Sequence, residues 1–205
     1  MKEIKLTRGQ VAIVDDEDYE RISKHNWAVH PQRAGYAVRK GNKKRGEPRT
    51  ILMHREVLNA PRDAQIDHIN RNSLDNRKCN LRLATVQKNA FNRAKPNVKC
   101  TSRYKGVFQR KDQKSWSARI KHNDRHIELG RYKEEAYAAA VYNYAARILF
   151  GEFRCENEDA LIPETLLQSD RSKIEMKCKA HLQLLSEQLS ACNAFAGHMH
   201  EGLSQ

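Results

Sequence analysis

The stretch QIDHINRNSLDNRKCNLRLATVQKNAFNR, residues 65–93, sets an acid and an imidazole side by side, Asp67 and His68, where a short apolar segment runs into an Asn-rich turn. A second strand-like run follows at 80–83, and Thr85 stands where it can cap a helix that begins near Val86. The stretch therefore predicts a strand, a loop, a strand and a helix within about thirty residues.

On the predicted helix, Asn89, Asn92 and Arg93 are three and four residues apart and share one face. We expect Val86 and Ala90 to face the core on the opposite side. If the polar face meets the end of the first strand, Asn89 converges with Asp67.

A carboxylate and an amide oxygen are hard ligands that suit Mg²⁺ or Mn²⁺, whereas a zinc site would favour thiolates. His68 points to the other side of the strand, where it can take a proton from an attacking water. The pattern is typical of phosphodiester hydrolysis, with Asp67 binding the ion and His68 activating the nucleophile.

The residues DHIN, with Asn80 twelve positions after His68 and Asn89 nine after Asn80, resemble the HNH endonuclease family, in its phage-type branch with Asn in the third position. The resemblance covers about residues 5–95. It implies a ββα-metal fold with one divalent ion, Asp67 and Asn89 as ligands, His68 as general base and Asn80 as the residue that orients His68. Asn92 and Arg93 are then expected to contact DNA.

The composition indicates a polyanionic partner, because 38 Lys and Arg stand against 25 Asp and Glu, a net charge of +13. The surplus lies before residue 154, and the remainder is acidic. No signal peptide or membrane-spanning run is visible, so we expect a protein of the cytoplasm of a phage-infected or bacterial cell. The five cysteines form no Cys-x-x-Cys pair, so neither a disulfide framework nor a zinc ribbon is indicated.

The chain divides into four predicted parts: 1–95, a linker at 96–102, a second compact module at 103–155, and an acidic tail at 156–205 with an amphipathic helix at about 172–190. The first part alternates strand-like runs with turns. Its acidic run DDEDYE is interpreted as the start of a short helix rather than as a metal site. The expected fold class is α+β.

In residues 103–150 the alternation predicts a three-stranded antiparallel sheet followed by a long Ala-rich helix that ends at Gly151. The apolar face of the sheet, which the helix can cover, comprises Val107, Trp116, Ala118, Ile120, Ile127 and Leu129. The other face carries Arg110, Arg119, Lys121, His126 and Glu128. A narrow basic sheet fits the DNA major groove.

The segments YKGVFQR, WSARI, IELGRY and AAAVYNYAARILFGEF resemble the APETALA2/ethylene-response-factor DNA-binding domain over about residues 101–155. The resemblance implies DNA contacts from Lys105, Arg110, Arg119, Lys121 and His126, with Tyr142 reaching the DNA backbone from the helix. Phe108 replaces a basic residue of that family, and the turn RKDQKSW lacks its Pro-Trp pair. The family's sequence preference therefore does not transfer.

These patterns together predict a DNA endonuclease of homing or mobile-element type that acts on double-stranded DNA, by nicking or by cutting both strands, as a monomer or weak dimer. One alternative is a DNA-binding transcriptional regulator with an inactive nuclease centre. Another is an RNA-directed nuclease, which long basic strands disfavour because A-form RNA has a narrow major groove.

Overall fold

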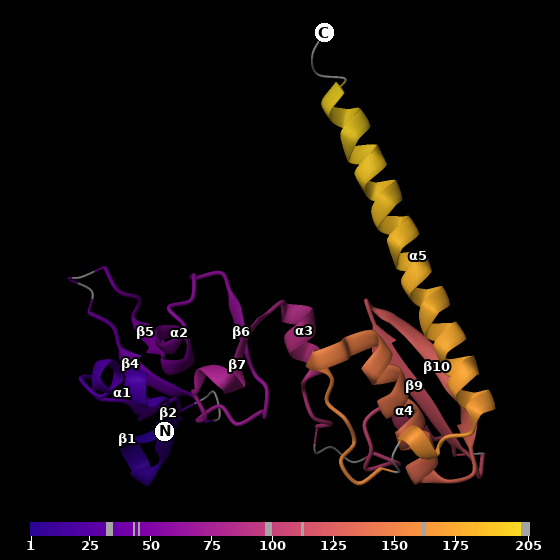
Figure 1. The fold of residues 1–205 in the computed structure, drawn as a ribbon, viewed down its shortest axis with the longest axis horizontal. Helices are drawn as coiled ribbons and strands as arrows, with labels where there is room; N and C mark the ends of the chain where they lie inside the picture. The colour runs from indigo at the N-terminus through magenta and orange to yellow at the C-terminus, as the bar shows by residue number, and fades with distance from the viewer. Residues whose placement is uncertain are drawn as a thin grey trace. The chain divides into compact units, whose positions relative to one another are not determined.

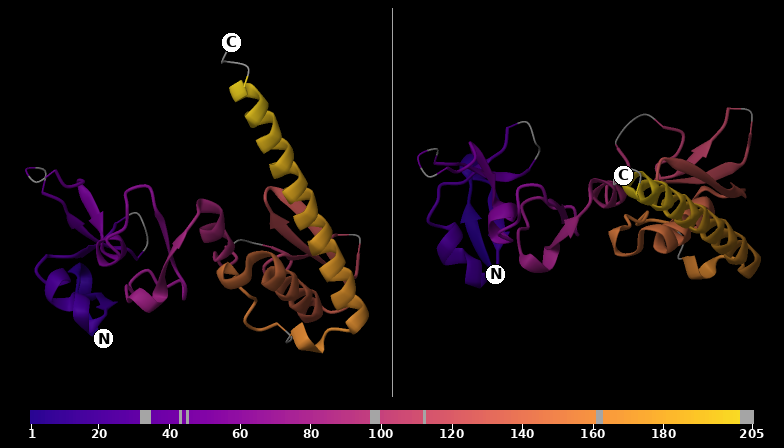
Figure 2. Two further views of the ribbon diagram at one scale, coloured as in Figure 1. Left: turned by 45° about the horizontal axis from the view of Figure 1, so that its top comes forward. Right: turned by 90° about the horizontal axis from the view of Figure 1, so that it is seen from above.

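The computed structural model describes residues 1–31, 35–42, 44, 46–96, 100–111, 113–160 and 163–201, without the side chains of 163 and 191–201. The chain forms two compact units, unit 1 (Met1–Arg93) and unit 2 (Ala94–Gln205) (Figures 1 and 2). Residues 97–99 of the predicted linker lie outside the described residues. Small sheets and helices in both units confirm the α+β class.

Unit 1 begins with the antiparallel pair β1 (Lys2–Lys5) and β2 (Val11–Val14), followed by α1 (Asp16–Ile22). A three-stranded antiparallel sheet comprises β3 (Ala28–Val29), β4 (Ala37–Lys40) and β5 (Thr50–Leu52), and α2 (Met53–Val57) follows it. Acidic residues fill the first turn of α1, where they meet the positive end of the helix dipole, as the sequence predicts.

The third sheet of unit 1 is the hairpin of β6 (Gln65–His68) and β7 (Leu81–Ala84), which precedes α3 (Val86–Phe91). Thr85 caps α3, because its hydroxyl accepts a hydrogen bond from the Lys88 amide at 3.1 Å. Ile66 and Leu81 join the buried apolar cluster of unit 1, so the hairpin is anchored in the core. The predicted order of strand, loop, strand and helix is therefore confirmed.

The face of α3 that was expected to be apolar is open to solvent. Val86 is 70% exposed and Ala90 is also exposed, whereas Asn92 is buried. The prediction that Val86 and Ala90 face the core is therefore wrong. The polar side of this short helix packs inward because the groups that it meets, at the end of β6, are themselves polar.

Unit 2 contains the predicted three-stranded antiparallel sheet, in the order β10 (Arg125–Tyr132), β9 (Trp116–His122) and β8 (Val107–Gln109). Val107, Ala118, Ile120 and Leu129 are buried on the face that α4 (Glu135–Phe150) covers. A β-bulge between Glu128 and Gly130 shifts the register of β10. Residues after the bulge therefore face the opposite side from the one that strict alternation predicts.

Close packing of α4 on the sheet depends on small residues. Ala138, Ala139, Ala145 and Ala146 are fully buried. Gly106 has φ +75° and lies against the Tyr142 ring, so a Cβ there would stand 2.1 Å from a ring carbon. Only glycine fits this position without displacing α4.

The tail carries one long helix, α5 (Gln168–Glu201), which begins before and ends after the predicted helix at 172–190. Ile174, Cys178 and His181 are buried on unit 2, and the Tyr137 hydroxyl of α4 donates to Asp170 at 2.8 Å. Leu182 and Leu189, farther along the helix, are exposed. Within the described residues, no helix is both long and apolar enough to cross a membrane.

Candidate active site

Asp67 and His68 are the last two residues of β6, and successive strand residues face opposite sides of the sheet. Both are buried, with 4% of Asp67 and 5% of His68 exposed. The hairpin thus holds a carboxylate and an imidazole in fixed positions that contact little water.

The Asp67 carboxylate is paired across the hairpin with Arg82, its register partner on β7. The guanidinium donates to Oδ2 of Asp67 from Nε at 2.9 Å and from a terminal nitrogen at 2.7 Å. Only 5% of the Asp67 side chain and 12% of the Arg82 side chain are exposed. Arg82 therefore balances much of the charge that burial makes costly.

Asn92, directly after α3, is the residue that meets Asp67. Its Nδ2 donates to the two carboxylate oxygens of Asp67 at 3.0 and 3.1 Å. Asn92 is 4% exposed, so the prediction that it contacts DNA is corrected. Asn89 is half-buried one turn earlier, and its approach to Asp67 stays a prediction.

The Asn92 amide nitrogen also lies 2.9 Å from the His68 carbonyl oxygen and 3.3 Å from that of Ile69. Four oxygens thus surround one NH₂ group, which has only two hydrogens to donate. Arg82 also donates to the Asp67 carboxylate, and the Arg71 amide donates to the His68 carbonyl at 2.9 Å, so these oxygens are hydrogen-bonded without an ion, and a cation would have to replace some of these contacts.

This donor set fits a hard divalent ion. It consists of carboxylate and carbonyl oxygens, which are among the ligands that Mg²⁺ and Mn²⁺ prefer, and the Asn92 amide would add its oxygen only if it turned over. Over the described ranges, no cluster of three or more His, Cys, Asp or Glu side chains is placed to hold a metal. A site at Asp67 would therefore depend on amide or backbone oxygens and on water.

The His68 ring lies among other aromatic and polar groups on the opposite side of β6. The ring centroids of His54 and Tyr36 are 5.2 and 5.9 Å from that of His68, and the Asn76 Oδ1 is 3.4 Å from its Nε2. Burial lowers the pKa of His68, although the Asn76 contact and the charge of Asp67 oppose the shift. Its imidazole is consequently neutral at neutral pH and able to accept a proton.

Asn80 is buried, and its side chain makes two hydrogen bonds within the loop between β6 and β7. Its Oδ1 accepts from the Asn70 amide at 2.9 Å, and its Nδ2 donates to the Asp75 carbonyl at 2.7 Å. Asn80 thus holds the loop between the strands, while Asn76 contacts His68. An effect of Asn80 on the orientation of His68 would therefore act through this loop, and it stays a prediction.

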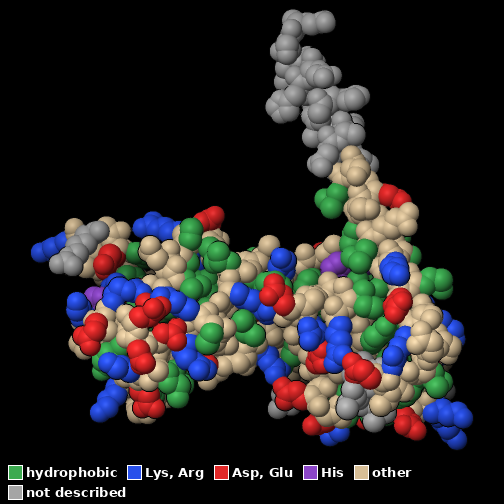
Figure 3. Space-filling model, in the orientation of Figure 1, with side chains coloured by type: hydrophobic (Ala, Val, Ile, Leu, Met, Phe, Trp, Pro, Cys, Tyr) green, Lys and Arg blue, Asp and Glu red, His purple; other side chains and the backbone are tan. Residues whose placement is uncertain are grey.

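The predicted basic side chains of unit 2 occupy the sheet face that α4 leaves uncovered, called here the open face. Arg119 lies 4.9 Å over the Phe108 ring and 3.7 Å from Glu128, and Lys121 pairs with Asp124 at 2.9 Å. His126 is exposed on the same face, and Arg110, just after β8, is also exposed. Figure 3 shows cationic and acidic side chains interspersed over the visible surface of both units.

Tyr142 does not belong to this surface. It is 3% exposed, packed under Gly106, and burial raises its pKa. The prediction that it reaches the DNA backbone is corrected. Lys105 is half-buried and Arg93 is exposed, so both keep their predicted roles as proposals.

The sequence interpretation missed four neighbours of the predicted residues: Arg82, Asn76, Arg131 and Lys177. Arg82 follows from pairing the two strands in register. Arg131 reaches the open face only because of the bulge, and it pairs there with Ser117. Lys177 comes from α5, and nothing local in the sequence indicates that it lies beside β10.

Comparison with known proteins gives two matches. Residues 59–91, which include β6, β7 and α3, match the family model for HNH endonuclease, a family whose members generally use a divalent metal ion. An uncharacterized HNH endonuclease of Acanthamoeba polyphaga mimivirus is 32% identical over 154 residues, which are 74% of this chain and 76% of that protein. These residues outnumber unit 1 (Met1–Arg93), so the similarity extends into unit 2. The chain belongs to the HNH endonuclease family and is thus a nuclease, a hydrolase of phosphodiester bonds.

Proposed function

We propose that the chain is a metal-dependent endonuclease of homing or mobile-element type that cleaves double-stranded DNA. One observation carries the proposal: Asp67 and His68 are consecutive buried residues at the end of β6, and the amide of Asn92 contacts the Asp67 carboxylate and the His68 carbonyl. The net charge of +13 supports DNA as the substrate, because a polyanion is attracted to such a surface.

In this proposal Asp67 and an amide oxygen, from Asn89 or Asn92, hold one Mg²⁺ or Mn²⁺. The bound ion supplies stabilisation of the negative charge that develops on the phosphate and the leaving oxygen. Half a turn of the Asn92 amide would present its oxygen in place of the nitrogen. The two hydrogen bonds from Arg82 hold the Asp67 carboxylate in a fixed direction.

His68 acts as general base and takes a proton from the attacking water. If its Nε2–H donates to the Asn76 Oδ1, the remaining nitrogen, Nδ1, carries the free lone pair and accepts the proton. Asn76 is therefore the residue that sets the tautomer. Burial lowers the pKa of His68, which keeps the base unprotonated before the reaction.

Unit 2 is proposed as the DNA-recognition part, through Lys105, Arg110, Arg119, Lys121 and His126. Its three antiparallel strands packed on one helix, with charges on the open face, support the resemblance to an APETALA2-type domain. A DNA-binding unit joined to a nuclease unit raises the local concentration of phosphodiester bonds at the active site. Cleavage would then require only weak DNA binding by unit 1.

The test compares the nicking of supercoiled plasmid by the full chain and by His68→Ala, with Mg²⁺ and with EDTA. We expect nicking by the wild type with Mg²⁺ and a loss of about 10²- to 10⁴-fold in His68→Ala, the contribution of a general base. His25→Ala is the matched control, because His25 lies outside the site and its ring is near Glu56.

Binding of a labelled duplex in EDTA completes the experiment, since His68→Ala should keep the wild-type affinity. Equal nicking by wild type and His68→Ala would contradict the role of His68. Binding without nicking by either protein would contradict the nuclease proposal.

That last outcome describes the second candidate, a DNA-binding regulator with an inactive nuclease centre. Two observations favour it: Arg82 and Asn92 already occupy the Asp67 carboxylate, and His68 is only 5% exposed. For cleavage, substrate or metal binding would have to displace a contact to Asp67 and open access to the His68 ring. The family membership favours the nuclease.

A further inference from the structure

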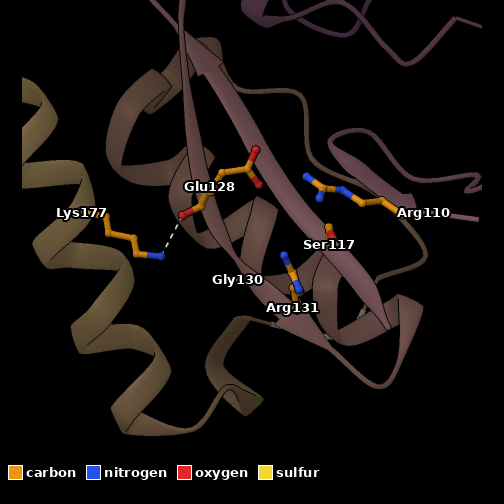
Figure 4. A pocket seen from close by; sticks show the side chains of 6 residues that line it. All are labelled: Arg110, Ser117, Glu128, Gly130, Arg131 and Lys177. Atoms are coloured by element: carbon orange, nitrogen blue, oxygen red, sulfur yellow. Dashed lines mark hydrogen bonds between the residues drawn. The ribbon is translucent and has the colours of Figure 1, made fainter. Parts of the chain in front are cut away.

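The open face of unit 2 contains a hollow of about 200 Å³ at the β10 bulge. Ser117 and the backbone at Gly130 form part of its wall, and the side chains that line it are those of Arg110 just after β8, Glu128 and Arg131 on β10, and Lys177 on α5 (Figure 4). Pockets for small organic ligands begin at roughly 300 Å³ and are mostly apolar. A small charged group suits this hollow better.

Positive charge predominates around the hollow. Three cationic side chains line it, against one carboxylate, Glu128. That carboxylate lies 3.7 Å from Arg119, a fourth cation on the same face, which offsets its charge. The surplus favours an anion.

Lys177 is held in place for such a contact. Its Nζ donates to the Glu128 carbonyl at 2.8 Å and to the Leu129 carbonyl at 3.2 Å. An ammonium group has three N–H bonds, so one remains to donate to a ligand. Because both acceptors belong to the bulge, α5 and β10 together fix the cation and reduce the entropy that binding would cost.

We propose that this hollow binds one backbone phosphate of DNA, so that α5 takes part in the interface through Lys177. Arg110 and Arg131 supply planar donors that match phosphate oxygens, and Lys177 supplies a fixed point charge. The inference rests on the proposed function, because it requires that unit 2 binds DNA. It extends the interface to a helix outside the predicted DNA-binding sheet.

The test measures the binding of the full chain to a 20-base-pair duplex by fluorescence anisotropy, in EDTA, between about 50 and 300 mM salt. One phosphate contact adds about 0.9 to the slope of log affinity against log salt, which is about eightfold in affinity near 0.1 M. Lys177→Gln should lose this amount in both slope and affinity. Lys179→Gln, the matched control on another face of α5, should change affinity by less than about twofold.

Two further variants separate binding from folding. Arg131→Gln removes an exposed side chain that lines the hollow from β10 rather than from α5, and it should weaken binding like Lys177→Gln. Glu128→Gln should tighten binding, because it removes the one acid of the hollow. Chemical unfolding of each variant shows whether the fold is kept, and Lys177→Arg should restore most of the affinity.

Equal affinities of Lys177→Gln and Lys179→Gln would overturn the proposal, and so would weaker binding by Glu128→Gln. A titration with inorganic phosphate separates the two sources of the anion. If Lys177→Gln loses phosphate binding but keeps wild-type DNA affinity, the hollow is a free-phosphate site and the DNA proposal is overturned. A wild type that binds no duplex contradicts the proposed function itself. Weaker DNA binding by Lys177→Gln than by Lys179→Gln, without nicking by the wild type, supports phosphate binding in the hollow but not the nuclease activity.

Discussion

The β6–β7 hairpin of unit 1 and the β8–β10 sheet of unit 2 place their charged side chains in contrasting environments. At the hairpin, Asp67 and His68 are buried, and the Asp67 carboxylate and the Nε2 atom of His68 have defined neighbours. On the sheet, the side chains of Arg119 and Lys121 are 41% and 55% exposed and form ion pairs with exposed carboxylates. Buried groups are costly unless they are paired, whereas exposed groups are nearly independent of the fold.

This difference indicates how the two regions respond to substitution. A change at the hairpin alters stability and chemistry together, because each side chain supports the next. A change on the open face alters binding alone. Salt should weaken DNA binding by the open face strongly. It should weaken the Asp67–Arg82 pair of the hairpin little, since buried pairs are poorly screened.

The largest expected effect separates the buried ion pair from the exposed one. Asp67→Ala leaves Arg82 without its carboxylate in a mostly buried place, so the free energy of unfolding should fall by roughly 3 to 5 kcal/mol. Glu128→Gln breaks the exposed contact to Arg119 and should cost less than about 1 kcal/mol. Urea unfolding of both variants measures the contrast. Equal losses would mean that the hairpin pair is no more structural than a surface pair.

A second effect concerns the open face alone. Arg119→Ala should reduce specific DNA affinity by about 1 to 3 kcal/mol and leave unfolding nearly unchanged, because the side chain is 41% exposed. Anisotropy with a target duplex, alongside urea unfolding, checks both parts. Unchanged affinity would remove the sheet from the interface, and a large loss of stability would remove the contrast between the two regions.

The smallest effect is a dependence of stability on pH that comes from the buried His54, whose ring lies beside that of His68. Burial lowers the pKa of His54 from 6.5 to about 3, so between these values the unfolded chain binds a proton that the folded chain does not. The stability is fully present above pH 6.5 and is lost as the pH falls, by about 1 kcal/mol between pH 6.5 and 5.5.

His54→Gln should remove this part of the pH dependence, and His25→Gln, near the surface, should keep it. Urea unfolding at the two pH values provides the measurement. The same loss in His54→Gln as in the wild type would show that other groups carry the acid sensitivity.

Local features of the fold were predictable from the sequence. A short apolar run indicated β6, alternation indicated β9 and β10, and Thr85 marked the start of α3, because these signals depend on residues a few positions apart. Family resemblance and charge indicated the nuclease class. The apolar face of the sheet in unit 2 followed from the same alternation.

The choice among chemically equal neighbours was not predictable. Asn89 and Asn92 are three residues apart and share a helix face, so only the packing of α3 on β6 brings Asn92 to Asp67. Asn76 and Asn80 both follow His68 in the segment that connects β6 to β7. The conformation of that segment brings Asn76 into contact with the His68 ring, while Asn80 bonds to the Asp75 carbonyl. Lys177 lies far from β10 in sequence, and no periodic pattern could place it there.

The bulge in β10 gives that strand two halves of opposite phase. Before it, Ile127 pairs with Ile120 on the covered side, and after it Gly130 pairs with Ala118 on that side while Arg131 turns outward. Deleting one residue at this point would exchange inside and outside for the rest of the strand, and Tyr132 would leave its place opposite Trp116. The length of this strand is therefore fixed to the residue, although its side chains on the open side are free to vary.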